Sequence, residues 1–133
     1  MLTKSRAPLV IVLVAAGCAP AAGPSGPLEP LMVGSEQHMS VEWQTAPRDQ
    51  TVVVWGYVTN RSPYTFDRLR VLVEGLGPDG AILEQRVVWA PGLLGGWGRN
   101  YFEAPIAPAP VYRVRVFSYD RVETDGLRRR WPF

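Results

Sequence analysis

The feature that most constrains the fold is an alternation of apolar and polar residues with a period of two. In residues 38–45, Met39, Val41 and Trp43 alternate with polar side chains, and residues 51–59 (TVVVWGYVT) are rich in β-branched and aromatic residues. Successive side chains of a strand point to opposite faces, so this pattern predicts strands with one buried face. No segment shows a sustained helical period, and we therefore expect a chain built from strands.

Further strands are expected at even spacing, separated by turns that contain Gly and Pro. They are residues 67–76, 81–89 and 111–120, with a shorter strand around residues 101–103. Gly77-Pro78-Asp79-Gly80 predicts a chain reversal, because Pro fixes φ and Gly accepts a positive φ. This spacing predicts an all-β fold, a small antiparallel immunoglobulin-like β-sandwich over residues 38–124.

Two of these strands carry aromatic residues on the face that we expect to point outward. In residues 51–59, Val54 and Val58 are expected to point inward, which leaves Trp55 and Tyr57 outside. In the last strand, the side chains expected in the core are Tyr112, Val114 and Val116. Those expected outside are Arg113, Arg115, Phe117 and Tyr119.

The outward side chains form one exposed surface if these two strands are neighbours in a single sheet. Trp, Tyr and Arg are enriched among the residues that dominate binding energies. A contiguous exposed apolar surface on a monomer usually has a functional reason. The alternative is that the C-terminal segment or residues 91–100 fold over this surface and make it a second small core.

Several short motifs occur in a fixed order along the same region. Val54-x-Gly56-x-Val58-x-Asn60 is followed by a strand, by Pro78-Asp79-Gly80, by Phe102 and by a strand ending in Tyr119-Asp120. This order resembles the FxLYD-type immunoglobulin-like domains of bacterial envelope proteins and lipoproteins, over roughly residues 40–122. The resemblance implies an immunoglobulin-like fold, and it supplies no common catalytic residues.

Residues 1–17 have the order of a secretory signal peptide. A basic start with Lys4 and Arg6 precedes a short apolar run and the small residues Ala15-Ala16-Gly17. The run is shorter than the roughly 20 residues of a membrane-spanning helix. A buried N-terminal helix is the alternative, and Pro8 disfavours it.

Ala15-Ala16-Gly17-Cys18 resembles the bacterial lipobox. The resemblance implies cleavage before Cys18, a diacylglyceryl group on its sulfur and anchoring in a membrane through acyl chains, each buried methylene contributing about 0.8 kcal/mol. Cys18 is the only cysteine and has no partner for an internal disulfide. Because Ala19 replaces the Asp that retains many such lipoproteins in the inner membrane, the resemblance implies the outer membrane, facing the periplasm, rather than the inner membrane.

Residues 18–37 are expected to form the acylated cysteine and a disordered tether. Residues 19–34 consist mainly of Ala, Pro and Gly with one charged residue, a composition that does not bury enough apolar surface to become ordered. At about 3.1 Å per residue the tether would extend at most roughly 50 Å. Residues 125–133 are expected to form a basic and aromatic tail that contacts anionic lipid, docks on a protein or remains frayed.

The charge of the chain argues against nucleic-acid binding. Removal of residues 1–17 takes away Lys4 and Arg6 and no acidic residue, so 14 basic residues become 12, equal to the 12 acidic ones. A nucleic-acid-binding domain is expected to be strongly basic. We therefore expect no nucleic-acid partner.

The sequence contains no constellation of residues that indicates catalysis or metal binding. His38 is the only histidine, at the start of a predicted strand, and Cys18 is assigned to the lipid anchor. A transition-metal site or a His-dependent triad requires more such residues. We expect no enzymatic activity, no cofactor and no metal site.

One further aromatic residue, Trp97, lies between glycines in Leu94-Gly95-Gly96-Trp97-Gly98. It is a candidate to contact a partner or a sugar, and the alternative is that it closes the end of the sandwich. The expected function is a membrane-anchored binding or scaffolding module for an envelope protein. A carbohydrate- or peptidoglycan-binding module and a structural subunit of a larger envelope complex are the alternatives.

Overall fold

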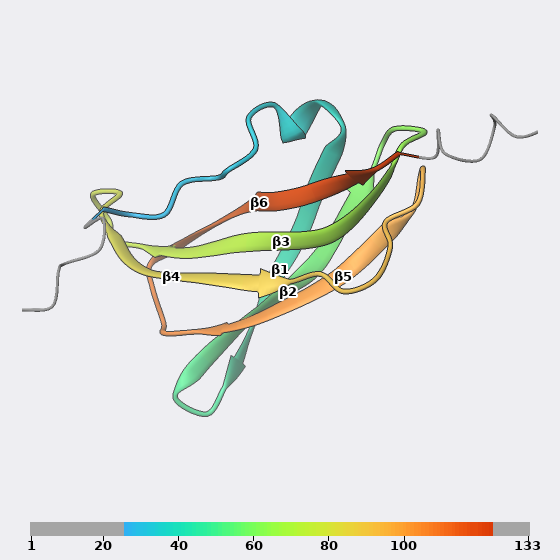
Figure 1. Cartoon of the computed structure of the whole chain (residues 1–133). Helices are drawn as coiled ribbons and strands as arrows, with labels where there is room; N and C mark the ends of the chain where they lie inside the picture. Colours follow the sequence, from blue (N-terminus) through green and yellow to red (C-terminus); the bar gives the residue numbers. More distant parts are fainter. Residues whose placement is uncertain (1–25, 124–133) are drawn as a thin grey trace, which may run out of the picture.

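The computed structural model describes residues 26–123, which form six β-strands and one turn of 3₁₀ helix (Figure 1). In chain order these elements are η1 (Ser35–Gln37), β1 (Met39–Arg48), β2 (Thr51–Asn60), β3 (Thr65–Leu76), β4 (Ile82–Trp89), β5 (Arg99–Ile106) and β6 (Val111–Val122). Residues 1–25, with the predicted signal peptide and Cys18, and residues 124–133, with the predicted tail, lie outside the described residues.

The strands form two three-stranded antiparallel sheets that face each other. Sheet A has the order β1-β2-β5 and sheet B the order β4-β3-β6. The expected all-β class and small antiparallel β-sandwich are confirmed. Within residues 26–123, no helix has the length and apolar character needed to cross a membrane.

The inward faces of the two sheets form the core, as the alternation of the sequence predicts. The fully buried core side chains include Val54, Val58, Phe66, Leu69, Val71, Val73, Leu94, Phe102, Ala104 and Ile106. Val116 of β6 belongs to the same core, and Tyr112 and Val114 are partly buried against it, so all three point inward as expected. Each buried aliphatic or aromatic side chain of this kind stabilises the fold by about 1.5–3 kcal/mol.

A pair of compensating bulges between β3 and β6 changes the expected side of Tyr119. The register shifts on either side of the Arg70–Ser118 pair, so Phe117 has no partner on β3. Because of this extra residue, the side chains that follow it on β6 point to the opposite face from the one that a regular strand would give them. Tyr119 therefore points to the core, where its ring packs edge-to-face on Phe66 with 4.9 Å between centroids. The prediction that Tyr119 lies outside is wrong, and Phe117, on the outer face, is buried rather than exposed.

An N-terminal segment that we call the strap, residues 26–33, lies across the outer face of sheet B (Figure 1). The backbone N–H of Leu28 donates to Gln85 Oε1 at 2.8 Å, and Gln85 Nε2 donates to the Leu28 carbonyl at 2.9 Å. The N–H of Leu31 donates to the carbonyl of Phe117 at 2.8 Å. The sequence predicts a tether over residues 18–37, whereas the structure places residues 26–37 against the sandwich. This segment makes few contacts within itself, and hydrogen bonds to residues of sheet B hold it in place.

Gly56, in the middle of β2, allows β1 to approach closely. A Cβ atom at this position would lie 1.9 Å from the carbonyl oxygen of Glu42 and 2.7 Å from Cα of Trp43. Both are backbone atoms of β1, so no side-chain rotation relieves the collision.

We predict that Gly56→Ala lowers the free energy of unfolding by about 1–3 kcal/mol, the range for overpacked sites. Urea denaturation followed by tryptophan fluorescence measures this change. Gly95→Ala is the matched control, because no atom lies within 4 Å of a Cβ built at Gly95. Equal unfolding midpoints for the two variants would contradict the prediction.

Candidate functional site

The residues predicted to form one binding surface lie on opposite sides of the sandwich. Trp55 and Tyr57 belong to β2 in sheet A, and Arg113, Arg115 and Phe117 belong to β6 in sheet B. The condition under which they would form one surface, adjacent strands in one sheet, is not met. The two outer faces are therefore separate candidates.

The outer face of sheet A carries three aromatic rings, Trp55, Tyr57 and Tyr101, of which Tyr101 contacts the other two; we call them the sheet A aromatic surface. Tyr101 is directly opposite Tyr57 in the register. Its ring centroid lies 6.3 Å from that of Trp55 and 5.6 Å from that of Tyr57. The guanidinium of Arg99 lies over the Tyr57 ring, 4.4 Å from its centroid, a geometry typical of cation–π contacts.

Sequence reasoning did not identify Tyr101 or Arg99 as part of this surface. Both lie on β5, and the pairing of β5 with β2 brings them beside Trp55 and Tyr57. The available signal is the alternation of Tyr101 and Glu103 with the buried Phe102 and Ala104. That signal gives the outward direction of Tyr101, but it does not give the neighbouring strand.

A shallow hollow of about 340 Å³ adjoins the Trp55 end of this surface. Side chains of β1, β2 and β5 line this hollow, and its charged groups are Arg48 and Glu103. The hydroxyl of Tyr101 donates to Glu103 Oε2 at 2.9 Å. This hydrogen bond, with a carboxylate beside it, raises the pKa of Tyr101 above its usual value of 10.0. Tyr101 therefore remains a neutral donor that orients the carboxylate of Glu103.

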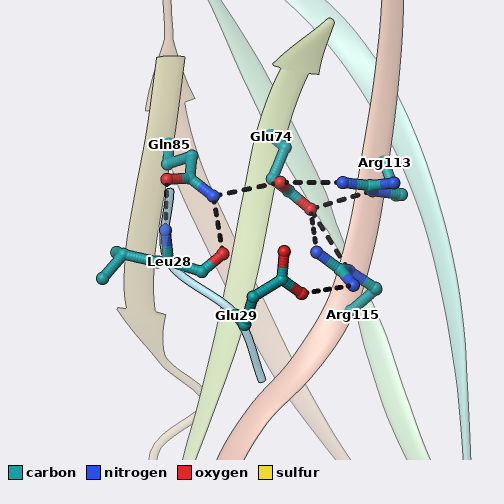
Figure 2. A network of polar contacts seen from close by, with 6 residues as sticks. All are labelled: Leu28, Glu29, Glu74, Gln85, Arg113 and Arg115. Atoms are coloured by element: carbon teal, nitrogen blue, oxygen red, sulfur yellow. Dashed lines mark hydrogen bonds and ion pairs between the residues drawn. The ribbon is translucent and has the colours of Figure 1, made fainter. Parts of the chain in front are cut away.

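The outer face of sheet B is organised around Glu74, a carboxylate with 0% exposure (Figure 2). Arg113 donates to it from Nε at 2.9 Å and from Nη2 at 3.1 Å. Arg115 donates from Nη2 at 2.8 Å and from Nε at 3.2 Å. Gln85 Nε2 donates at 3.0 Å, and Arg115 also pairs with Glu29 of the strap at 3.4 Å.

Arg113 and Arg115 thus hold the carboxylate of Glu74, and Arg115 also holds the strap through Glu29. Burial by itself would raise the pKa of Glu74, but the hydrogen bonds from Arg113, Arg115 and Gln85 outweigh burial and lower the pKa below its usual 4.5. The same contact raises the pKa of Arg113. The network is thus fully ionised at neutral pH, and its two arginines are engaged within the fold.

Trp97 is exposed on a loop that is held in place by a buried asparagine. Asn60, with 0% exposure, donates from Nδ2 to the carbonyls of Tyr64 and Gly95 at 2.6 and 3.0 Å, and the N–H of Trp97 donates to the carbonyl of Ser62 at 3.2 Å. Leu94, not Trp97, closes this end of the sandwich: Leu94 has 0% exposure and Trp97 has 69%.

The described residues show no arrangement that indicates metal chemistry. Within residues 26–123, no group of three or more His, Cys, Asp or Glu side chains is placed to hold a metal ion. His38 lies against the ring of Tyr64, with 6.0 Å between centroids in an edge-to-face contact.

Comparison of the chain with protein-family models, with curated proteins and with solved structures found no match.

The lowered pKa of Glu74 predicts a specific loss of stability in acid. A group whose folded pKa lies below its unfolded value stabilises the protein above the unfolded pKa, and this contribution is lost as the pH falls through the folded pKa. Because the usual value is 4.5, the contribution should be complete at neutral pH and should decline below about pH 4.5.

We predict that Glu74→Gln lowers the free energy of unfolding by about 1–3 kcal/mol at neutral pH, and that the difference from the wild type shrinks as the pH falls below 4.5. Urea titrations over a pH series measure both effects. Glu36→Gln is the control, because Glu36 is exposed and its side chain makes none of the contacts described above. A difference that is independent of pH would refute the assignment.

Proposed function

We propose that this chain is a lipid-anchored envelope protein whose β-sandwich is a non-catalytic binding or scaffolding module, and that the sheet A aromatic surface contacts a protein partner. The observation that carries the proposal is the difference between the two outer faces. The strap covers the middle of sheet B, where Leu72 and Glu74 have 0% exposure. On sheet A, Tyr101 keeps 42% exposure, and Trp55 and Tyr57 are half-buried.

The composition and rigidity of the sheet A aromatic surface suit a protein interface. Aromatic side chains supply a large contact area at a small cost in conformational entropy. Here the rings also restrain one another, since Tyr101 contacts both Trp55 and Tyr57 and Arg99 lies over Tyr57. A surface that is ordered before binding loses less entropy when the partner docks.

Anchoring through Cys18 would hold this module close to the bilayer. Seven residues separate Cys18 from the strap, which begins at Gly26. At a maximum of about 3.6 Å per residue, this distance is at most about 29 Å. The strap begins at the end of the sandwich where β3 and β4 are connected (Figure 1), so that end would lie nearest to the membrane.

One observation favours a glycan as the second candidate ligand. In the register of sheet A, Trp55 lies directly opposite Gln44 on β1 and Glu103 on β5. An aromatic ring flanked by planar polar side chains can receive the C–H face of a sugar while the polar groups bond its hydroxyls. Quenching or enhancement of tryptophan fluorescence by soluble peptidoglycan fragments, abolished by Trp55→Ala, would favour this candidate over the protein partner.

We predict that the double variant Trp55→Ala/Tyr57→Ala loses at least tenfold in partner affinity, since interface aromatics each contribute 2 kcal/mol or more when they are hot spots. Pull-down from native membranes with the lipidated protein, followed by a titration with the captured protein, measures this loss. Leu93→Ala is the control, because Leu93 is an exposed apolar residue outside the sheet A aromatic surface. Equal capture by the wild type and the double variant would refute the proposal.

We predict that Cys18→Ser releases the protein from the membrane. Without acyl chains, the apolar burial that retains the protein, about 0.8 kcal/mol per methylene, is lost. Partition between detergent-rich and aqueous phases measures the effect: the wild type should enter the detergent-rich phase and the variant the aqueous phase. A wild-type protein recovered in the aqueous phase would contradict lipid anchoring.

A further inference from the structure

The outer face of sheet B carries a second arginine arrangement, centred on Arg70 and separate from Glu74. The guanidinium carbon of Arg70 lies 5.5 Å from the ring centroid of Trp89 and 5.2 Å from that of Phe117. Its Nε donates to Ser118 Oγ at 2.8 Å. Two aromatic rings and one hydrogen bond therefore fix the position and the plane of this cation.

Unlike its neighbours, Arg70 has no counter-ion among residues 26–123. Arg113 and Arg115 pair with Glu74, and Arg68 pairs with Asp120. No described carboxylate forms an ion pair with Arg70, and its Nη groups donate to no described residue. A half-buried guanidinium with free Nη donors is a receptor for an anion, because its planar fork matches the two oxygens of a carboxylate or phosphate.

Arg70 lines an open hollow of about 470 Å³ between four segments of the chain. Leu31 of the strap and Trp89 of β4 contribute apolar walls, Arg68 and Arg70 come from β3, and Ser118 and Asp120 come from β6. The volume falls in the range of small-molecule sites, which are commonly about 300–1,000 Å³. Trp89 is 56% exposed, so much of its indole is available to a bound molecule.

The charges around the hollow favour an anion with a single charge. Asp120 lines the same hollow and is paired with Arg68, so Arg70 carries the unmatched charge among the described residues that line the hollow. A dianionic phosphate would be attracted by Arg70 but repelled by the carboxylate of Asp120. A monoanionic carboxylate matches the free charge, and the apolar walls suit the organic group that bears it.

We propose that the Arg70 hollow is a binding site for an organic carboxylate, with its oxygens on the free Nη groups of Arg70 and its apolar portion between Trp89 and Leu31. This site lies on the opposite side of the sandwich from the sheet A aromatic surface, so it is a function in addition to the proposed partner binding. The strap completes the site, because Leu31 is fixed over it by the hydrogen bond to Phe117.

The test is a calorimetric titration of the full chain with phenylacetate, with the neutral isostere phenylacetamide and with inorganic phosphate. Phenylacetate should bind at least tenfold more tightly than either of the other two probes. An NMR titration should show a shift of the Arg70 Nε–H signal at the same midpoint. Equal binding of the acid and the amide, tighter binding of phosphate, or no binding of phenylacetate would each overturn the proposal.

Variants locate the site and separate it from the proposed interface. Arg70→Gln should weaken phenylacetate binding at least tenfold, and Trp89→Ala should weaken phenylacetate more than acetate. Arg86→Gln, a solvent-exposed arginine that pairs with Glu84, should bind as the wild type does. Trp55→Ala/Tyr57→Ala should also bind phenylacetate normally, so failure of the partner interface leaves this test unaffected. Unchanged affinity in both Arg70→Gln and Trp89→Ala would overturn the site.

Discussion

A carboxylate without solvent exposure lies in the central strand of sheet B, and much of the surrounding structure depends on it. An isolated buried charge is strongly unfavourable unless it is paired and hydrogen-bonded. Glu74 accepts five hydrogen bonds, from Gln85 on β4 and from Arg113 and Arg115 on β6. Because these donors come from both neighbouring strands, one side chain cross-links the whole sheet.

The same network determines how the N-terminal segment is held. Gln85 donates to Glu74 and also exchanges two hydrogen bonds with the backbone of Leu28, while Arg115 reaches Glu29. The strap is therefore fixed on sheet B and covers Leu72 and Glu74 there, whereas Trp89 of the same sheet remains 56% exposed. Sheet A keeps its aromatic rings accessible. The asymmetry that supports the proposed function follows from the way in which one buried charge is satisfied.

How much of the candidate site could be predicted differs from residue to residue. The outward direction of Trp55 and Tyr57 follows from the inward Val54 and Val58 and needs no tertiary information. The side taken by Tyr119 depends on the extra residue Phe117, and a bulge leaves no mark on the alternation of β6. From the sequence alone, Arg70 is expected to be a solvent-exposed charged residue. Its contacts with Trp89 and Phe117 exist only because β4 and β6 flank β3.

The sequence by itself determined the all-β class, the existence of the six strands, the inward face of β2 and the reversal at residues 77–80, because each depends on residues within a few positions of one another. Which strands share a sheet, where the strap lies and which arginines have counter-ions were decided only by the tertiary structure. Period-two alternation shows which side chains of a strand face the core. Every strand around that core has the same pattern, so the pattern does not show which strands are neighbours. The pairing of strands and the position of the strap depend on the packing of the whole molecule. The hydrogen bond between Leu28 and Gln85, for example, joins residues 57 positions apart in the chain.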